Sequence, residues 1–200
     1  MVVSQGWRNL GVKDYQLERF CCMAVPEFIV SLREKVGQDP LWLPAVTAVV
    51  IRDVPPGSPF HVVPDVLLVK RADTGEWTPP TGICDPDEQP HVTAVREVKE
   101  ETGLDVSVEA LLGVGAVGPV TYQNGDVASY MDTTMRCVVS GDSDEPHVGD
   151  DENVDVAWFP ISKMPVTNQR FRMVIADAVA QLKHPQGYKP RMGYEKRNAR

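Results

Sequence analysis

The chain has 200 residues, of which 42% are hydrophobic and 24% are charged, so it has room for one domain with a real core but not for two full domains. Its formal net charge of −8 argues against a general nucleic-acid binder, because phosphate backbones require a basic surface. No segment approaches the ~18 consecutive apolar residues of a membrane span, and the N-terminus lacks the apolar stretch of a signal peptide.

The four cysteines show neither the spacing of zinc ligands nor a disulfide framework, which indicates a soluble, cytoplasmic protein with reduced thiols. Charge is uneven along the chain. Residues 185–200 hold five Lys or Arg and one Glu, about +4, which leaves about −12 on residues 1–184. We expect this basic C-terminal tail to be a frayed, solvated terminus, with contact to a partner or a polyphosphate as the alternative.

The first half of the chain predicts one helix followed by two strands. A helix is expected at 26–36, because a proline suits its first turn and Gly37 suits its C-cap. The apolar runs "AVTAVVI" at 45–51 and "DVLLVKR" at 65–71 are typical of buried strands. "WTPPTG" at 77–82 contains two prolines and a glycine, which predicts an ordered turn instead of a regular element.

The second half alternates predicted helices and strands, at 90–102 (helix), 105–117 (strand), 120–140 (two strands), 154–160 (strand) and 168–183 (helix). Asn124-Gly125 is a strong signal for a hairpin turn within 120–140. Thr167 is the expected N-cap of the last helix. Strands with a few interspersed helices predict an α+β or mixed α/β fold, in which a sheet lies between helices.

The helix at 90–102 concentrates carboxylates on one side. At about 100° per residue, Glu97, Glu100 and Glu101 fall within an arc of roughly 100°. Like charges at these spacings repel, so the arrangement is poor for stability alone. A hard divalent cation relieves this repulsion, and the cluster therefore predicts an Mg²⁺ or Mn²⁺ site, with a solvated acidic face as the simpler alternative. The adjoining apolar face, for docking on the sheet, comprises Ala94, Val95, Val98 and Thr102.

Four further residues surround this cluster in the sequence. Arg96 directly precedes the first carboxylate, Gly103 ends the helix, and Gly82 and Glu88 lie upstream in a loop expected to fold back over the helix N-terminus. Together with the carboxylates they match G-x5-E-x7-R-E-U-x-E-E-x-G-U, where U is a bulky aliphatic residue, with every fixed position filled. This pattern resembles the Nudix box, and the chain is similar to Nudix hydrolases of the MutT-like superfamily.

The resemblance implies a Nudix-type α/β/α sandwich with a mixed sheet between helices. It divides the chain into an N-terminal arm and helix (1–41), a Nudix hydrolase domain (42–184) and the basic C-terminal tail (185–200). By analogy with one branch of the family, the N-terminal part is a possible dimerisation element, which makes a homodimer the expected assembly.

The activity that the resemblance implies is metal-dependent hydrolysis of a diphosphate bond in a nucleoside diphosphate linked to a moiety X. Glu97 and Glu101 would be direct ligands of Mg²⁺ or Mn²⁺, Glu100 a ligand or a water-mediated contact, and Arg96 would orient Glu97. The general base varies across the family, and the candidates here are Glu100 and Glu152, the latter from the acidic loop that precedes the strand at 154–160.

The remaining positions of the box would have structural roles. Glu88 would hold the loop against the helix, and a backbone carbonyl near Thr81–Gly82 could complete the coordination shell of the metal. Many members of the family have Gly-Gly at this entrance, where the present chain has Thr81-Gly82, so a different entrance shape is possible. Outside the box, Trp77 and Tyr122 are candidate substrate-binding residues, although loop or strand packing is the simpler interpretation of both.

The expected substrate is a small nucleotide, and the sequence leaves its identity open. ADP-ribose or a sugar nucleotide is the first expectation. A (d)NTP pyrophosphatase that releases pyrophosphate is the alternative, and a non-catalytic nucleotide sensor is less consistent with three intact carboxylates. Within the family, a proline and a tyrosine some 15–18 positions after the box hint at different subclasses. Here Pro119 and Tyr122 both occupy that window, so the two hints disagree.

Overall fold

The structure is a computed structural model that describes residues 25–194 except 60 and 123. The predicted N-terminal arm and residues 195–200 lie outside the described part. Three helices are present, α1 (Glu27–Val36), α2 (Pro90–Thr102) and α3 (Gln169–Lys183). The strands are β1 (Leu41–Arg52), β2 (Asp65–Arg71), β3 (Trp77–Thr78), β4 (Thr81–Ile83), β5 (Val106–Thr121), β6 (Val127–Val139), β7 (Asn153–Pro160) and β8 (Arg191–Met192).

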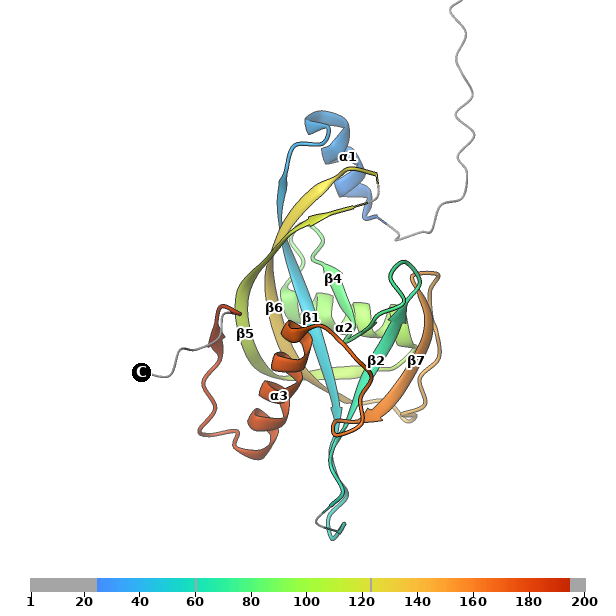
Figure 1. The fold of residues 1–200 in the computed structure, drawn as a ribbon, viewed down its shortest axis with the longest axis vertical. Coiled ribbons are helices and arrows are strands. Elements are labelled where there is room, and N and C mark those ends of the chain that lie inside the picture. Colours follow the sequence, from blue (N-terminus) through green and yellow to red (C-terminus); the bar gives the residue numbers. More distant parts are fainter. Residues whose placement is uncertain (1–24, 60, 123, 195–200) are drawn as a thin grey trace, which may run out of the picture.

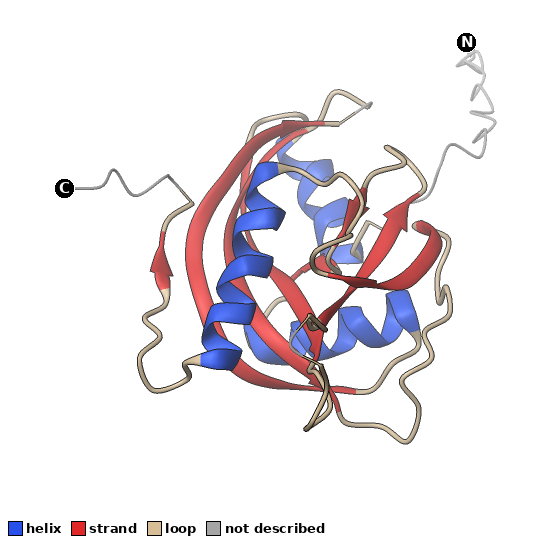
Figure 2. Ribbon diagram, turned by 60° about the horizontal axis from the view of Figure 1, so that its bottom comes forward, coloured by secondary structure: helices blue, strands red, loops and turns tan. Residues whose placement is uncertain are grey.

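The strands form a mixed sheet, and α2 and α3 cover opposite faces of it (Figure 1 and Figure 2). Its order is β3-β2-β1-β6-β5-β8, with β4 added beside β1 and β7 beside β2. β1 runs parallel to β6 and β5 parallel to β8, whereas the other pairs are antiparallel. The expected mixed α/β fold, with a sheet between helices, is therefore confirmed.

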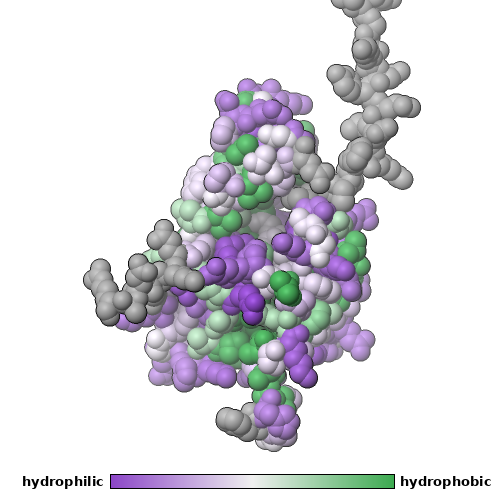
Figure 3. Space-filling view, in the orientation of Figure 1, coloured by the Kyte–Doolittle hydropathy of each residue, from purple (hydrophilic) through white to green (hydrophobic). Residues whose placement is uncertain are grey.

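Each face of the sheet has its own hydrophobic core. Val98 and Ala94 of α2 are fully buried against one face, as the apolar stripe of that helix predicts. Ile175 and Val174 of α3 are equally buried against the other. The face that carries α3 shows hydrophilic groups near its centre, with hydrophobic groups beside and below them (Figure 3). No helix within the described ranges is long and apolar enough to cross a membrane.

Several element boundaries differ from the sequence-based predictions. The segment 77–82 contains the short strands β3 and the start of β4, where a turn without regular structure was expected. β5 is continuous from Val106 to Thr121, because it keeps pairing with β6 on both sides of an irregularity between Val117 and Val120 that contains Pro119. The turn at Asn124-Gly125 is confirmed. Helix α3 is capped by Asn168, whose side chain accepts a hydrogen bond from the Phe171 amide, and not by Thr167.

Helix α1 is attached to an extension of the sheet, where β1, β5 and β6 continue beyond the α2 and α3 layers (Figure 1). Ile29 packs against Leu43 of β1 and Ala128 of β6 in a third, small hydrophobic cluster. The guanidinium of Arg33 donates to the Val127 carbonyl at 3.0 Å. These contacts fix α1 over the turn between β5 and β6.

The C-terminal segment is not frayed up to residue 194, which corrects the expectation for this part of the tail. β8 pairs with Gly113 and Val114 of β5, and Arg191 forms a two-pronged ion pair with Asp177 of α3 at 2.7 and 3.0 Å. A Cβ on Gly113 would lie 2.9 Å from the Arg191 side chain, and one on Gly115 would lie 2.8 Å from the Tyr194 ring. The absence of side chains at these two glycines of β5 therefore allows the C-terminal segment to pack against the strand.

Candidate active site

The site is built where β4 brings the loop before α2 against the middle of that helix. Gly82 of β4 pairs with Val46 of β1, which places its backbone directly over Glu97. A Cβ on Gly82 would lie 1.9 Å from both Cδ and Oε1 of the Glu97 carboxylate. The glycine is required here because the carboxylate occupies the space that any side chain would need.

Arg96 joins the loop to the acidic face of the helix. Its Nε and Nη2 donate to the Glu88 carboxylate at 3.0 Å each, and Nη2 also donates to the Ile83 carbonyl. Its Nη1 lies 2.9 Å from Glu97 Oε1 and 2.9 Å from Glu100 Oε2. Hydrogen bonds from Arg96 are the largest of the effects that lower the pKa of Glu88 to about 2. The arrangement is consistent with the orienting role that the sequence predicts for Arg96 and the bracing role predicted for Glu88.

The three clustered carboxylates differ sharply in exposure. Glu101 is buried, the side chain of Glu97 is 14% exposed, and that of Glu100 is 53% exposed. Burial, opposed by Arg96 and aided by the nearby charges of Glu100 and Glu152, raises the pKa of Glu97 to about 7. Burial and the charge of Glu97 also raise the pKa of Glu101 well above its usual value. The three carboxylates on this side of the helix thus range from buried to solvent-exposed.

Glu101 is held by two donors from outside its helix. Its Oε1 accepts from the Thr81 amide and its Oε2 from the Asn153 side chain, both at 3.2 Å. The threonine at the box entrance therefore supplies a backbone donor without steric conflict. Asn153 is a contact that sequence reasoning missed. It directly follows Glu152 and begins β7, so the end of the acidic loop was the signal that could have found it.

The acidic loop before β7 is packed over the C-terminal end of α2. The amides of His147 and Gly149 donate to the carbonyls of Thr102 and Glu101, which the helix itself leaves without partners. The His147 ring occupies the space that a Cβ on Gly103 would need. These bonds place Glu152 on the same cavity as the box. Its charge contributes to the raised pKa values of Glu97 and Glu101, which is consistent with the predicted entry of one loop acid into the site.

The donor set fits a hard divalent cation in its chemistry. The carboxylates supply only oxygen ligands, and burial and mutual repulsion already disfavour their charged forms, which a cation would reverse. In the described part of the chain, however, no three His, Cys, Asp or Glu side chains already form a metal-holding group. The three carboxylates point to different partners. Glu97 and Glu100 form ion pairs with Arg96, and Glu101 accepts hydrogen bonds from Thr81 and Asn153.

These groups line a cavity of about 920 Å³. Its lining includes Arg96, Glu97, Glu100, Gly82 and Glu152 on the acidic side, and Pro26, Val117, Val120, Tyr122 and Tyr130 on an apolar and aromatic side. The hydroxyl groups of Tyr122 and Tyr130 contact each other. Tyr122 is therefore placed where a substrate could reach it. Trp77 is not part of this lining and packs edge-on against Phe159 with ring centroids 4.9 Å apart, and its role in substrate binding stays a prediction.

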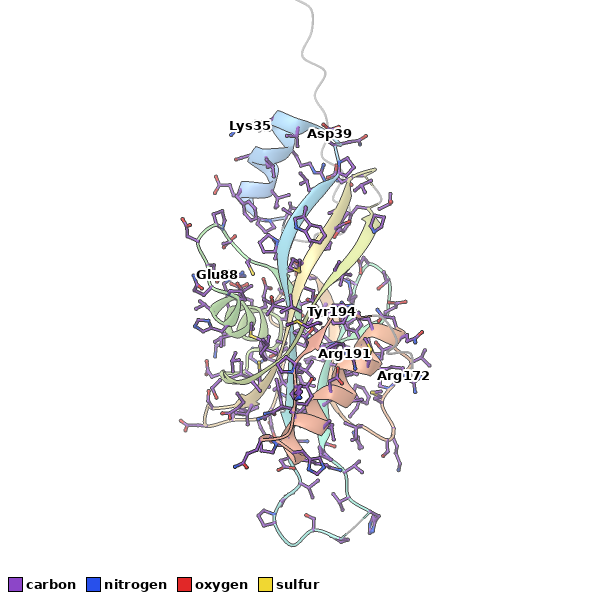
Figure 4. The ribbon with its side chains drawn as sticks, turned by 90° about the vertical axis from the view of Figure 1, so that its left-hand side faces the viewer. Lys35, Asp39, Glu88, Arg172, Arg191 and Tyr194 are labelled. Carbon is purple, nitrogen blue, oxygen red and sulfur yellow. The ribbon has the colours of Figure 1, made fainter. Side chains whose placement is uncertain are left out.

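A buried polar cluster, also missed by sequence reasoning, lines the cavity from the side of α3. At its centre is Asp132 of β6, whose carboxylate accepts from Thr47 at 2.8 Å, Thr134 at 3.0 Å and Arg170 at 3.0 Å. The hydroxyl of Tyr194, from the C-terminal segment, donates to the same carboxylate. Glu88 and Tyr194 lie on opposite sides of the central strands (Figure 4). We call the group of Thr47, Asp132, Thr134, Arg170 and Tyr194 the Asp132 cluster.

A mixed sheet between two helices, with a glycine loop and an arginine-braced carboxylate helix at one cavity, defines a Nudix-type fold and site. The family model described as the NUDIX domain matches residues 43–181, which is more than half of the chain. The chain therefore belongs to the Nudix family.

Similar proteins agree with this assignment. A MutT-like protein of Streptomyces ambofaciens is 34% identical over 93 residues, which are 46% of this chain and 53% of the relative. The human 8-oxo-dGDP phosphatase NUDT18 is 31% identical over 104 residues, 50% of this chain and 30% of the relative. The chain thus spans about half or less of the length of these relatives.

Among solved structures, a UDP-X diphosphatase is similar with a TM-score of 0.54 and 20% identity, over 84% of this chain and 74% of that one. An ADP-ribose pyrophosphatase of Streptococcus suis is similar with a TM-score of 0.52 and 20% identity, over 76% and 97%. At this identity the likeness supports the fold alone.

Proposed function

We propose that the chain is a divalent-metal-dependent pyrophosphohydrolase that cleaves a nucleoside diphosphate linked to X, with ADP-ribose or a sugar nucleotide as substrate. The observation that carries the proposal is that Gly82, Arg96, Glu97 and Glu100 of the box line one cavity of about 920 Å³, which also has an aromatic and apolar side. A cavity of this size and make-up suits a nucleotide with its base and a second group, and exceeds what a diphosphate alone requires.

Each box residue has a task that follows from its surroundings. Glu97 and Glu101, with Glu100 as a further oxygen donor, would hold Mg²⁺ or Mn²⁺. The ion would neutralise the diphosphate and make the attacking water more acidic. Arg96 sets the direction of the Glu97 carboxylate through its 2.9 Å contact and is itself fixed by Glu88. Packing of Asn153 and Thr81 against Glu101 excludes water from the inner end of the cluster.

The proton of the attacking water requires a carboxylate base on the cavity wall. Glu100 and Glu152 both line the cavity, from the helix and from the opposite loop. We assign the base to Glu152. Arg96 pairs with the Glu100 carboxylate at 2.9 Å and directs it toward the brace on its own helix, whereas Glu152 faces the same cavity from the opposite loop. Glu152→Gln should therefore lower the rate more than Glu100→Gln does, with Mg²⁺ affinity affected in the opposite order.

A panel of substrates with purified protein and Mg²⁺ tests the proposal. ADP-ribose and sugar nucleotides should yield a nucleoside monophosphate and a phosphorylated X, and a chelator should abolish turnover. Pyrophosphate from a dNTP would instead support the alternative of a (d)NTP pyrophosphatase, for which the specific argument is a Bacillus subtilis relative named as a putative 8-oxo-dGTP diphosphatase, 47% identical over 49 residues. Nucleotide binding without turnover of any compound would contradict both and indicate a sensor.

Homodimerisation through the α1 region stays a prediction. Val30 of α1 and Trp42 of β1 expose 48% and 56% of their surfaces, so this region has apolar side chains available for a partner. Sedimentation of wild-type protein and of a Val30→Glu, Trp42→Glu variant tests it. A monomer–dimer difference between the two supports the assignment, and an unchanged oligomeric state contradicts it.

A further inference from the structure

The α3 side of the cavity contains an arginine whose charge is already balanced. Arg170 lies at the start of α3, lines the cavity, and pairs through Nη1 with Asp132 at 3.0 Å and with the Thr47 hydroxyl at 3.1 Å. Asp132 and Thr47 are buried, and the Arg170 side chain is 20% exposed. The pair is thus nearly neutral, so it offers directional donors without a strong pull on a phosphate.

One of the guanidinium nitrogens, Nη1, carries the hydrogen bonds that hold Arg170. Among the described residues, the hydrogen-bond partners of Arg170 are all bound through Nη1, which leaves the edge formed by Nε and Nη2. Two parallel N–H groups on that edge match two adjacent acceptor atoms on a planar partner. The guanidinium lies 4.2 Å from the centroid of the Phe171 ring and 5.5 Å from that of Tyr194. These aromatic rings help to fix the orientation of the guanidinium plane.

The C-terminal segment sets the position of this arginine. The Tyr194 hydroxyl bonds both the Asp132 carboxylate and Thr134, which lies 2.6 Å away, so it fixes the acceptor that holds Arg170. Tyr194 lies beyond residue 181, where the match to the family model ends. A residue outside the family domain therefore controls the geometry of a cavity-lining residue.

We propose that Arg170 determines nucleobase specificity by bidentate hydrogen bonding to a base with two adjacent acceptors, the O6 and N7 atoms of guanine, and that Tyr194 is its positioning residue. Adenine presents a donor at the position of O6 and cannot satisfy both N–H groups. The inference rests on the proposed function. Within that function it favours guanine sugar nucleotides over ADP-ribose as the substrate class.

The test compares kcat/KM for GDP-glucose, IDP-glucose and ADP-glucose, which share the diphosphate and the sugar. IDP-glucose keeps O6 and N7 but lacks the 2-amino group. Wild-type protein should prefer GDP-glucose and IDP-glucose over ADP-glucose by about 10-fold or more, the discrimination typical of one bidentate pair. Arg170→Lys keeps the charge that balances Asp132 but loses the two parallel N–H groups, so the preference for GDP-glucose and IDP-glucose over ADP-glucose should disappear.

Two tyrosine variants separate positioning from general packing. Tyr194→Phe removes the hydroxyl at Asp132 and should lower the preference for GDP-glucose over ADP-glucose. Tyr188→Phe is the matched control, because it removes a hydroxyl of the same segment that donates to the Leu112 carbonyl at 2.8 Å and does not touch Asp132. A purely structural role for Tyr194 would lower turnover of all three substrates equally and leave their ratio unchanged.

The outcomes separate this inference from the proposed function. No wild-type preference, a preference that survives Arg170→Lys, or an equal loss for all substrates would overturn the inference. If no compound is hydrolysed, the proposed function fails, and calorimetric titration with GMP, IMP and AMP tests the inference alone. Tighter binding of GMP and IMP that is lost in Arg170→Lys supports it, and equal affinities overturn it.

Discussion

The acidic side and the α3 side of the cavity differ in how their buried negative charges are compensated. On the acidic side, Glu97 and Glu101 are crowded, and burial together with the like charges around them raises their pKa values. On the α3 side, Asp132 is more deeply buried than Glu97 but is matched by Arg170 and by three hydroxyl donors. A cluster with excess negative charge is suited to binding a cation. A cluster whose charges are compensated is suited to fixing the positions of its side chains. Substitutions on the two sides should therefore fail in different ways.

Removing a carboxylate from the acidic side should have the largest effect on activity. Glu97→Gln and Glu101→Gln each delete a charge from the proposed metal site, so we expect kcat to fall at least about 100-fold while the protein stays folded. Mg²⁺-dependent hydrolysis of the best substrate, with circular dichroism on the same samples, measures this. Glu34→Gln, at an exposed position of α1, is the matched control and should be silent. Unchanged turnover in both site variants would refute the metal assignment.

The opposite result is expected for the α3 side, where stability should suffer most. Asp132→Asn leaves Arg170 and the hydroxyl donors without their common anionic acceptor, and we expect the free energy of unfolding to fall by about 3 kcal/mol. Denaturant unfolding without metal measures it. Asp126→Asn is the control, since its ion pair with Arg33 is longer, at 3.4 Å, and more exposed, and should contribute under about 1 kcal/mol. Equal costs at the two positions would contradict the contrast between the two sides.

How far the sequence predicts each side follows from how each is assembled. The acidic side comes almost entirely from 82–104, so spacing on one helix sufficed to predict the arc of Glu97, Glu100 and Glu101 and the brace from Arg96. The Asp132 cluster draws one or two residues each from β1, β6, α3 and the C-terminal segment, up to 147 positions apart between Thr47 and Tyr194. No local periodicity links such residues, because only the strand register brings them together.

The same distinction explains the errors in the fold. The turn at Asn124-Gly125 is specified by its own two residues, and it was predicted. The path of β5 through Pro119 depends on pairing with β6. The sequence-based prediction used local residues alone and ended one strand before Pro119 and began another after it. The sequence of the C-terminal segment does not itself indicate that the segment docks. The indication lies in Gly113 and Gly115 of β5, where the absence of side chains makes room for Arg191 and Tyr194.

A subtler substitution on the acidic side should separate activity from stability. In Gly82→Ala the new Cβ would overlap the Glu97 carboxylate, which is the flexible end of a side chain and can move aside. We therefore expect turnover to fall about 10-fold or more, with a loss of unfolding free energy below about 2 kcal/mol. Gly187→Ala has open space around the new methyl group and is the control. A large stability loss with normal activity in the remaining folded protein would contradict the proposed position of Glu97.

The smallest effect should come from the brace itself and should depend on pH. Arg96 holds the pKa of Glu88 at about 2, below its ordinary value of 4.5. A carboxyl with a lowered pKa in the folded state stabilises the fold above about pH 4.5, and that contribution is lost as the pH falls toward 2. Wild-type protein should therefore exceed Glu88→Gln in unfolding free energy by about 1–2 kcal/mol at pH 7, after allowance for solvent screening, and the difference should vanish near pH 2. Urea unfolding of both proteins at pH 7, 5, 4 and 3 measures the trend. A difference that stays constant with pH would show that Glu88 acts through neutral hydrogen bonds with Thr93 and the backbone, and not through its charge pairing with Arg96.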